Sequence, residues 1–176
     1  MISLGIDCSI TYQMNKYNIK YISSPFDWIY SEKITDIIQL IDNKFYGFTD
    51  FNNYNIQLIK ENTFFGLNNA LELNKRSNFM MKHKYYKIRL PHELEILDDI
   101  SKFQIKYDKL IDEFYKHDNL TFIRLGKKDD INFLDQLIIV LKKYFANFKI
   151  IFVDISKYKT SNWQKNELPW DKIFNL

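Results

Sequence analysis

The chain has 176 residues, a length that predicts a single domain over residues 1–176 rather than two. Hydrophobic residues make up 46% and aromatic residues 17% of the sequence, which is enough for a large core without a disulfide or a structural metal. The formal net charge of +3 is carried mainly by lysines, and those dispersed along helical segments, such as Lys106 and Lys142, indicate a solvated face. We therefore expect no nucleic-acid partner.

The chain contains one cysteine, Cys8, which excludes an internal disulfide and a cysteine-rich zinc site and indicates a reducing compartment. The first residues lack the basic and apolar regions of a signal peptide, and no apolar run approaches the ~20 residues that span a bilayer. No glycine-rich phosphate loop and no metal-binding helix motif is present. We expect a cytoplasmic protein with no membrane partner and no cofactor or metal.

The first half of the chain alternates short apolar segments with amphipathic ones. The predicted elements are a strand at Ile2–Gly5, a helix from Ser9 to about Tyr17, a loop at Ser23–Trp28, a helix capped by Ser31 and ending near Asn43, and a strand near Tyr54–Ile59. The segment Asn52–Asn78 has the weakest periodicity, and we expect most of it to be loop.

The second half contains the clearest pattern in the sequence. The predicted elements are a strand at Tyr85–Leu90, a helix over Leu94–Lys116 with a break near Gln104–Lys106, a strand at Leu120–Leu125, a helix at Asp130–Phe145, a strand at Phe148–Val153 and a short helix at Leu168–Phe174. Two apolar strands around one helix predict a parallel βαβ unit.

This unit predicts an α/β fold, a Rossmann-like three-layer sandwich with a largely parallel sheet. We expect the strand at Ile2–Gly5 to join the same sheet, which would place Cys8 at the carboxyl edge of the strands.

Cys8 follows a predicted strand and precedes a predicted helix, where backbone N–H groups and the helix dipole stabilise a thiolate. This position suits a nucleophile, although free cysteines more often behave as small buried hydrophobic residues. His92 follows the predicted strand Tyr85–Leu90 and could act as a general base, or simply cap a helix. His83 lies between lysines and is predicted to be on the surface, and His117 to offset a helix dipole.

Two aspartates are candidate catalytic carboxylates. Asp27 lies between Phe26 and Trp28, which predicts either a partly buried, hydrogen-bonded carboxylate or a structural cap of the following turn. Asp154 follows the strand Phe148–Val153, at the edge where open α/β sheets collect ligands.

Two motifs follow one another in the first part of the chain, Ser3-Leu4-Gly5-Ile6-Asp7-Cys8 and then Pro25-Phe26-Asp27-Trp28. They resemble the Ser-Leu-Gly-x-x-Cys start and the Asp-Trp element of a family of papain-like cysteine peptidases, and this resemblance implies a papain-like α+β fold as the alternative to the Rossmann-like one. The likeness continues through Pro91-His92-Glu93, Phe122–Gly126 and Trp170–Phe174.

The resemblance implies a thiol hydrolase of peptidase or amidase type in which Cys8 is the nucleophile, His92 the general base and Asp27 an orienting carboxylate. The substrate would be a peptide, an amide or a glycan-linked group. We expect Cys8 and His92 to meet in a cleft lined by Phe26 and Trp28. An acyl- or glycan-modifying enzyme on a Rossmann-like sheet and a non-enzymatic binding module are the alternatives.

Overall fold

A computed structural model describes residues 1–19, 21–58, 64–65, 79–91, 93, 100–158 and 167–175. The strands are β1 (Ile2–Ser3), β2 (Tyr30–Ser31), β3 (Tyr54–Leu58), β4 (Phe64–Phe65), β5 (Phe79–His83), β6 (Ile88–Leu90), β7 (Leu120–Gly126) and β8 (Phe148–Asp154). The α-helices are α1 (Ser9–Lys16), α2 (Ile34–Asp42), α5 (Ile100–Phe114), α6 (Leu134–Lys142) and α7 (Trp170–Phe174), and 3-10 helices occur at η1 (Phe51–Asn53) and η3 (Lys128–Phe133).

The first sheet has the strand order β1-β7-β8, and all its pairings are parallel. β7 and β8 pair in register from Leu120 opposite Phe148 to Gly126 opposite Asp154. The predicted parallel pairing of these two strands is therefore confirmed, and so is the expectation that the first strand joins them. Because β1 runs parallel to β7, the segment that leads to Cys8 leaves the sheet at its carboxyl edge.

The second sheet is antiparallel, with the order β2-β6-β5-β3-β4. The chain thus combines a parallel and an antiparallel sheet, which confirms a mixed α/β composition. The largely parallel three-layer sandwich is not confirmed, and a papain-like α+β arrangement is compatible with the two sheets.

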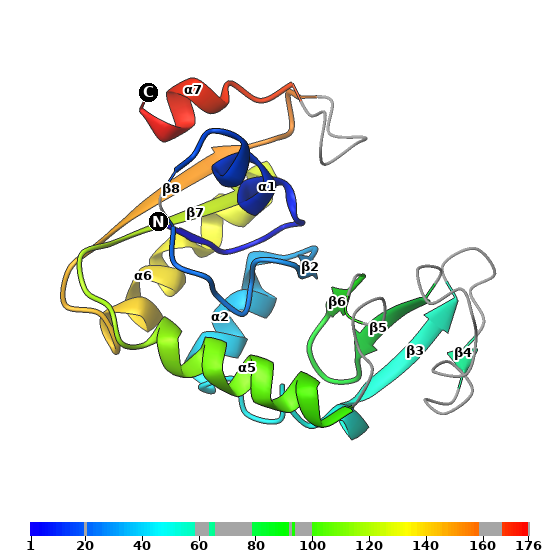
Figure 1. Cartoon of the computed structure of the whole chain (residues 1–176). Helices are drawn as coiled ribbons and strands as arrows, with labels where there is room; N and C mark the ends of the chain where they lie inside the picture. The colour runs from blue at the N-terminus through cyan, green and yellow to red at the C-terminus, as the bar shows by residue number, and fades with distance from the viewer. Residues whose placement is uncertain are drawn as a thin grey trace.

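The side chains of β7 alternate between two buried clusters on opposite faces of the parallel sheet. Phe122 packs with residues of α2, α5 and α6, whereas Ile123 and Leu125 pack with residues of α1 and α7. Figure 1 shows α6 along one side of β7 and β8, and α7 near α1 beside the same two strands. The parallel sheet is therefore covered on both faces by apolar helix surfaces.

Helix α5 joins the two sheets through aromatic contacts at both of its ends. Phe114 packs against Phe122 of β7, with ring centroids 6.0 Å apart, and Phe103 packs against Tyr54 of β3, with centroids 5.5 Å apart. In Figure 1 the helix runs beneath α2 toward the antiparallel sheet. One continuous core, rich in aromatic rings, therefore extends from the parallel to the antiparallel sheet.

Three local predictions need correction. The helix at Ile100–Phe114 continues without a break through Gln104, because its apolar face stays buried on both sides of that position. Helix α2 begins at Ile34 with Lys33 as its N-cap, and Ser31 lies in β2 instead. His83 is buried, because residues 79, 81 and 83 share the inner face of β5.

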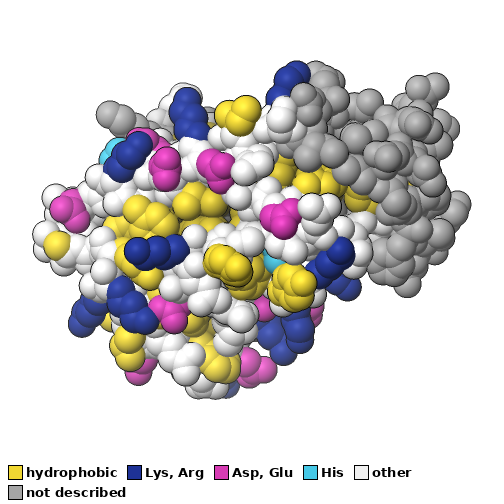
Figure 2. Space-filling view, turned by 90° about the horizontal axis from the view of Figure 1, so that it is seen from below, with side chains coloured by type: hydrophobic (Ala, Val, Ile, Leu, Met, Phe, Trp, Pro, Cys, Tyr) yellow, Lys and Arg dark blue, Asp and Glu magenta, His cyan; other side chains and the backbone are white. Residues whose placement is uncertain are grey.

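Within the described residues, no helix is both long enough and apolar enough to cross a membrane. On the face shown in Figure 2, lysines, arginines and acidic side chains are interspersed among hydrophobic patches. This face carries charges of both signs.

Candidate functional site

Cys8 occupies the N-cap of α1, immediately after the loop that follows β1. Gly5 in this loop has φ +75°, and a Cβ at this position would lie 3.0 Å from Ser31 Oγ. A larger residue would therefore be both strained and crowded. The helix starts with a hydrogen bond from Tyr12 N–H to the Cys8 carbonyl (3.0 Å), and Asp7 accepts the Ser9 N–H (2.8 Å). The predicted position of Cys8, between a strand and a helix start, is confirmed.

The Cys8 thiol is buried, with 3% of the residue exposed. The pKa of the thiol is raised to about 12, mainly by burial and to a lesser extent by the nearby carboxylates of Asp7 and Asp27. A hydrogen bond at the helix start acts in the opposite direction but is the weakest of these influences. In this conformation the thiol is protonated at neutral pH, because desolvation outweighs the helix start.

Asp27 is one of the two carboxylates that raise the Cys8 pKa, and its side chain is buried as well. It accepts hydrogen bonds from Ser24 N–H (3.1 Å), Ser24 Oγ (3.0 Å) and Thr11 Oγ1 (3.3 Å). Burial raises the pKa of Asp27 to about 6, although these hydrogen bonds and the nearby Lys106 ammonium lower it. The sequence left open a partly buried, hydrogen-bonded carboxylate or a cap of the following turn, and the structure shows a buried carboxylate whose hydrogen bonds come from Ser24 and Thr11, which precede it in the chain.

The residues on either side of Asp27 differ in their surroundings. Phe26 is fully buried and packs against Phe45 and Phe114, with ring centroids 5.2 and 5.6 Å apart. It belongs to the central core, so the expectation that Phe26 lines an open cleft is wrong. Trp28 is half-buried.

A second buried carboxylate, Glu93, was missed by the sequence analysis. Glu93 is 1% exposed, and it accepts hydrogen bonds from Lys106 Nζ (2.7 and 2.9 Å) and from the Tyr107 hydroxyl (2.8 Å). Burial raises the pKa of Tyr107 well above its usual value, and the charges of Glu93 and, more weakly, Asp27 raise it further. Lys106 is therefore an ion-pair partner of Glu93, rather than only part of a solvated lysine face.

The sequence holds a weak signal for this cluster. Glu93 directly follows His92, and Lys106 and Tyr107 lie on consecutive positions of α5. The alternation of exposed and buried residues along α5 places Tyr107 inside and leaves Lys106 at the border of the core. A carboxylate partner for a border lysine is a common arrangement, but sequence spacing alone does not identify it.

His92, the predicted general base, lies outside the described residues. Of the other histidines, His117 is close to Glu113, with Nε2 2.7 Å from Oε1, at the end of α5. His83 lies in the antiparallel sheet, far along the chain from Cys8. The expectation that Cys8 and His92 meet in one cleft therefore stays a prediction, and so does the role of His92 as general base.

Asp154 is the alternative carboxylate, and it lies at the carboxyl end of β8 as predicted. It accepts hydrogen bonds from Ser156 N–H (2.9 Å) and Ser156 Oγ (2.6 Å) at the protein surface. These bonds lower its pKa. Among the described groups, Asp7 and Asp27 are the carboxylates that raise the Cys8 pKa.

Arg124 of β7 donates hydrogen bonds to the loop that precedes Cys8. This role was not identified from the sequence. The guanidinium is fully buried and donates from Nη1 to the Leu4 carbonyl (2.9 Å) and to Ser31 Oγ (2.6 Å), and from Nη2 to the Ser31 carbonyl (3.1 Å). Burial lowers its pKa to about 10, so the group keeps its charge at neutral pH. Arg124 thus fixes the backbone just before Gly5.

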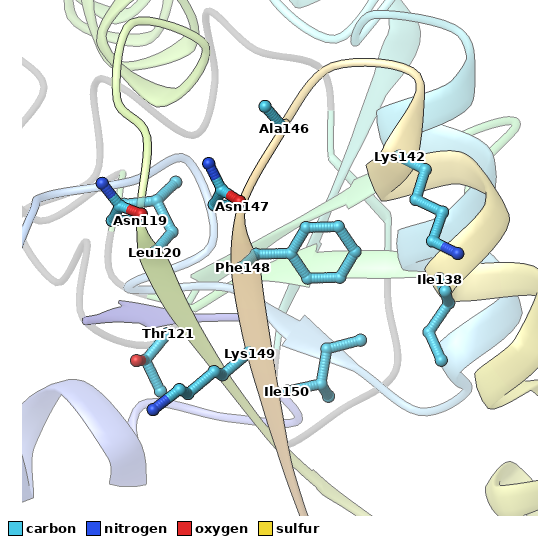
Figure 3. Close-up of a pocket in the computed structure, with 10 residues that line it drawn as sticks. All are labelled: Asn119, Leu120, Thr121, Ile138, Lys142, Ala146, Asn147, Phe148, Lys149 and Ile150. Carbon is cyan, nitrogen blue, oxygen red and sulfur yellow. The ribbon is translucent and has the colours of Figure 1, made fainter.

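A cavity of about 830 Å³ lies at the opposite end of the parallel sheet from Cys8. Figure 3 shows Phe148 and Ile150 of β8 facing Ile138 and Lys142 of α6 across it. Leu120 and Phe148 begin their strands, so this cavity lies at the amino edge of the sheet. Cys8, Asp27 and Asp154, the candidate catalytic residues that the structure describes, do not line it. The described residues also include no cluster of histidine, cysteine or acidic side chains that could hold a metal ion.

A sequence model of the family described as "putative papain-like cysteine peptidase" matches residues 1–157. The chain belongs to this family. The match covers Cys8, Asp27, His92 and Glu93, and it includes both sheets. The family description supports a cysteine hydrolase in general.

This chain is also similar to an uncharacterized protein of Acanthamoeba polyphaga mimivirus. The two sequences are 25% identical over an alignment 217 positions long, gaps included, which spans 98% of this chain and 95% of the viral protein. No solved structure matches the chain.

Proposed function

We propose that this protein is a cysteine hydrolase of peptidase or amidase type in which Cys8 is the nucleophile. The observation that carries the proposal is the position of Cys8 at the start of α1, beside the buried Asp27, in a chain of the papain-like peptidase family. His92 is proposed as the general base, and Asp27 as the carboxylate that orients it.

The proposed reaction transfers one acyl group through two steps. The His92 imidazole takes the Cys8 proton, and the thiolate attacks the acyl carbon of a peptide or amide. Collapse of the tetrahedral intermediate breaks the C–N bond, and the imidazolium gives its proton to the leaving amine. Water, deprotonated by the imidazole, then attacks the thioester, which releases the carboxylic acid and restores the thiol.

The described conformation sets a clear requirement for this mechanism. With a pKa of about 12, the buried thiol carries almost no negative charge near pH 7. An adjacent imidazolium favours the thiolate, and access of water to the sulfur removes part of the desolvation cost. We therefore propose that pairing with His92 brings the pKa of the Cys8 thiol into the neutral range in the native protein.

Iodoacetamide labelling across pH tests the proposal. Native protein should label at Cys8 with an apparent pKa below the ~8.5 of a free thiol. Labelling should disappear in Cys8→Ser, and its pKa should rise in His92→Ala. His117→Ala is the matched control, because His117 pairs with Glu113 at the end of α5 and should leave labelling unchanged.

Labelling that requires denaturant, or that does not depend on His92, would contradict the proposal. If Cys8 labels as expected, assays with fluorogenic peptide and amide substrates distinguish peptidase from amidase activity. Either activity should be lost in Cys8→Ser. The burial of the thiol also favours a second candidate function, a binding module in which Cys8 is a structural residue. In that case both labelling and hydrolysis would be absent from the native protein.

A further inference from the structure

A second cavity, of about 740 Å³, opens between three segments that are distant in sequence. Its lining comes from the loop after α2, from η1, from the turn between β5 and β6, and from α5. The residues used below are Tyr46, Thr49, Asp50, Asn52, Tyr85 and Gln104. We call this space the tyrosine cavity. None of the described residues of the Cys8 site lines it.

Two tyrosine rings at the tyrosine cavity face solvent. Tyr46 is 84% exposed and Tyr85 is 74% exposed, the largest exposures among the large hydrophobic residues that the structure describes. An exposed aromatic ring offers a wide apolar face at a low entropic cost, because only two side-chain torsions are fixed on binding. Two such rings at one cavity suit a ligand that has flat apolar faces.

Buried His83 holds the two tyrosine-bearing segments in place. Its Nδ1 accepts hydrogen bonds from the backbone N–H groups of Tyr85 and Tyr86, both at 3.1 Å. Since Nδ1 accepts, the ring proton is assigned to Nε2, which faces the Gly47 carbonyl at 3.4 Å. The Tyr86 hydroxyl also donates to the Tyr46 carbonyl (3.1 Å). The turn and the loop are therefore joined before any ligand arrives, which reduces the ordering cost of binding.

The other lining side chains supply hydrogen bonds without positive charge. Thr49, Asn52 and Gln104 offer hydroxyl and amide groups, and Asp50 offers a carboxylate. None of the described lining residues is a lysine or arginine, and the nearby Lys84 ammonium already donates to the Asn52 carbonyl (2.6 Å). The described side chains therefore favour a ligand rich in hydroxyl groups over one held by phosphate or sulfate contacts.

The backbone around the tyrosine cavity also disfavours an extended peptide. The described lining residues lie in loops, in η1 and in α5, and none belongs to a strand. A peptide that adds to a sheet requires a strand edge whose N–H and C=O groups are available. The lining offers side chains and aromatic faces instead.

We propose that the tyrosine cavity binds a neutral carbohydrate. The C–H face of a sugar ring would stack on Tyr46 or Tyr85, and its hydroxyl groups would exchange hydrogen bonds with Asp50, Asn52 and Gln104. This proposal is independent of the hydrolase activity, because it uses none of the residues assigned to the Cys8 site.

Isothermal titration of the full chain with neutral hexasaccharides tests the proposal. The probes are the hexamers of cellulose, starch, chitin and β-mannan, with inorganic phosphate and a random hexapeptide mixture as comparators. At least one sugar should bind, and Tyr46→Ala and Tyr85→Ala should each weaken it about tenfold. Tyr46→Phe and Tyr85→Phe keep the stacking face and should retain most of the affinity.

Two control variants isolate the cavity. Tyr158→Ala removes another partly exposed tyrosine outside the tyrosine cavity and should leave binding unchanged. Cys8→Ser should also bind normally, which separates this proposal from the hydrolase. Thermal denaturation of each variant checks that the alanine changes leave the fold intact. Absence of sugar binding, binding that survives the double alanine change, or binding of the peptide mixture in place of the sugars would overturn the proposal.

Discussion

Asp27 and Asp154 accept the same kind of hydrogen bonds, yet their acidities change in opposite directions. Each carboxylate binds a serine hydroxyl and the backbone N–H of that same serine. At the surface these bonds lower the pKa of Asp154. In the interior, burial raises the pKa of Asp27 to about 6 despite one more hydrogen bond, from Thr11. For a carboxylate, the loss of water outweighs three neutral donors.

The largest expected effect is on stability, for the change Asp27→Ala. At pH 5, where Asp27 is mostly protonated, the change leaves two Ser24 donors and the Thr11 hydroxyl without their acceptor in the interior. We expect the free energy of unfolding to fall by about 3–4 kcal/mol. Urea denaturation measures this. Asp154→Ala is the matched control, and an equal loss in both variants would show that burial is not the cause.

The pH dependence of stability should differ in sign between the two aspartates. Between about pH 4 and pH 6 the folded protein keeps a proton on Asp27 that the unfolded chain has lost, so this group lowers stability as the pH rises. The contribution is about 2–3 kcal/mol and is complete above pH 6. Asp154 has a lowered pKa, so its contribution is present above the unfolded pKa and is lost as the pH falls.

Denaturation curves at several pH values, for wild type and for Asp27→Asn and Asp154→Asn, measure these contributions by difference. The wild-type minus Asp27→Asn curve should fall from pH 4 to pH 6. A curve that rises over this interval would mean that the hydrogen bonds to Asp27 outweigh its burial.

A smaller effect is expected from removing one donor. Thr11→Val keeps the volume of the fully buried side chain and removes its hydrogen bond to Asp27. We expect a stability loss of about 1 kcal/mol and a further rise in the Asp27 pKa. Carboxyl titration followed by NMR measures the pKa directly. An unchanged Asp27 pKa would show that the 3.3 Å contact has no electrostatic influence.

The smallest effect is expected at the surface. Ser156→Ala removes the hydroxyl that donates to Asp154, and the Asp154 pKa should rise toward its ordinary value. Stability should not change measurably, because solvent replaces the lost bond. The same NMR titration and a thermal denaturation curve check both statements. A clear loss of stability would show that this turn supports β8 more strongly than its exposure indicates.

The parallel part of the fold was predictable because its strands are long and apolar on both faces. β7 and β8 each have seven residues around one amphipathic segment, a pattern that specifies a parallel crossover. The antiparallel sheet was not predicted. Its strands β3 and β6 lie within the predicted strands near Tyr54–Ile59 and at Tyr85–Leu90, but β2 and β4 have only two residues each, too few for a recognisable alternation. Their pairing depends on partners distant in the sequence.

The candidate site was predictable where a local sequence determines the environment. The apolar neighbours of Asp27 indicated its burial, and a strand followed by a helix placed Cys8. Glu93 and Arg124 were missed because their partners lie 13 to 120 residues away. His83 was misplaced because its lysine neighbours were given more weight than the alternation of β5. Strand periodicity is the signal that would have found it.

The buried Arg124 has a consequence for how the molecule unfolds. Its guanidinium donates to Leu4 beside the parallel sheet and to Ser31 in the antiparallel sheet, so both sheets satisfy the same charge. If either sheet opened alone, the Arg124 guanidinium would stay buried but lose some of its hydrogen-bond acceptors. This would raise the free energy of the partly open state by several kcal/mol. A state in which only one of the two sheets is open is therefore unfavourable, whichever sheet opens. The two sheets should melt in one calorimetric transition, and Arg124→Met, which removes the shared charge, should allow the transition to separate into two.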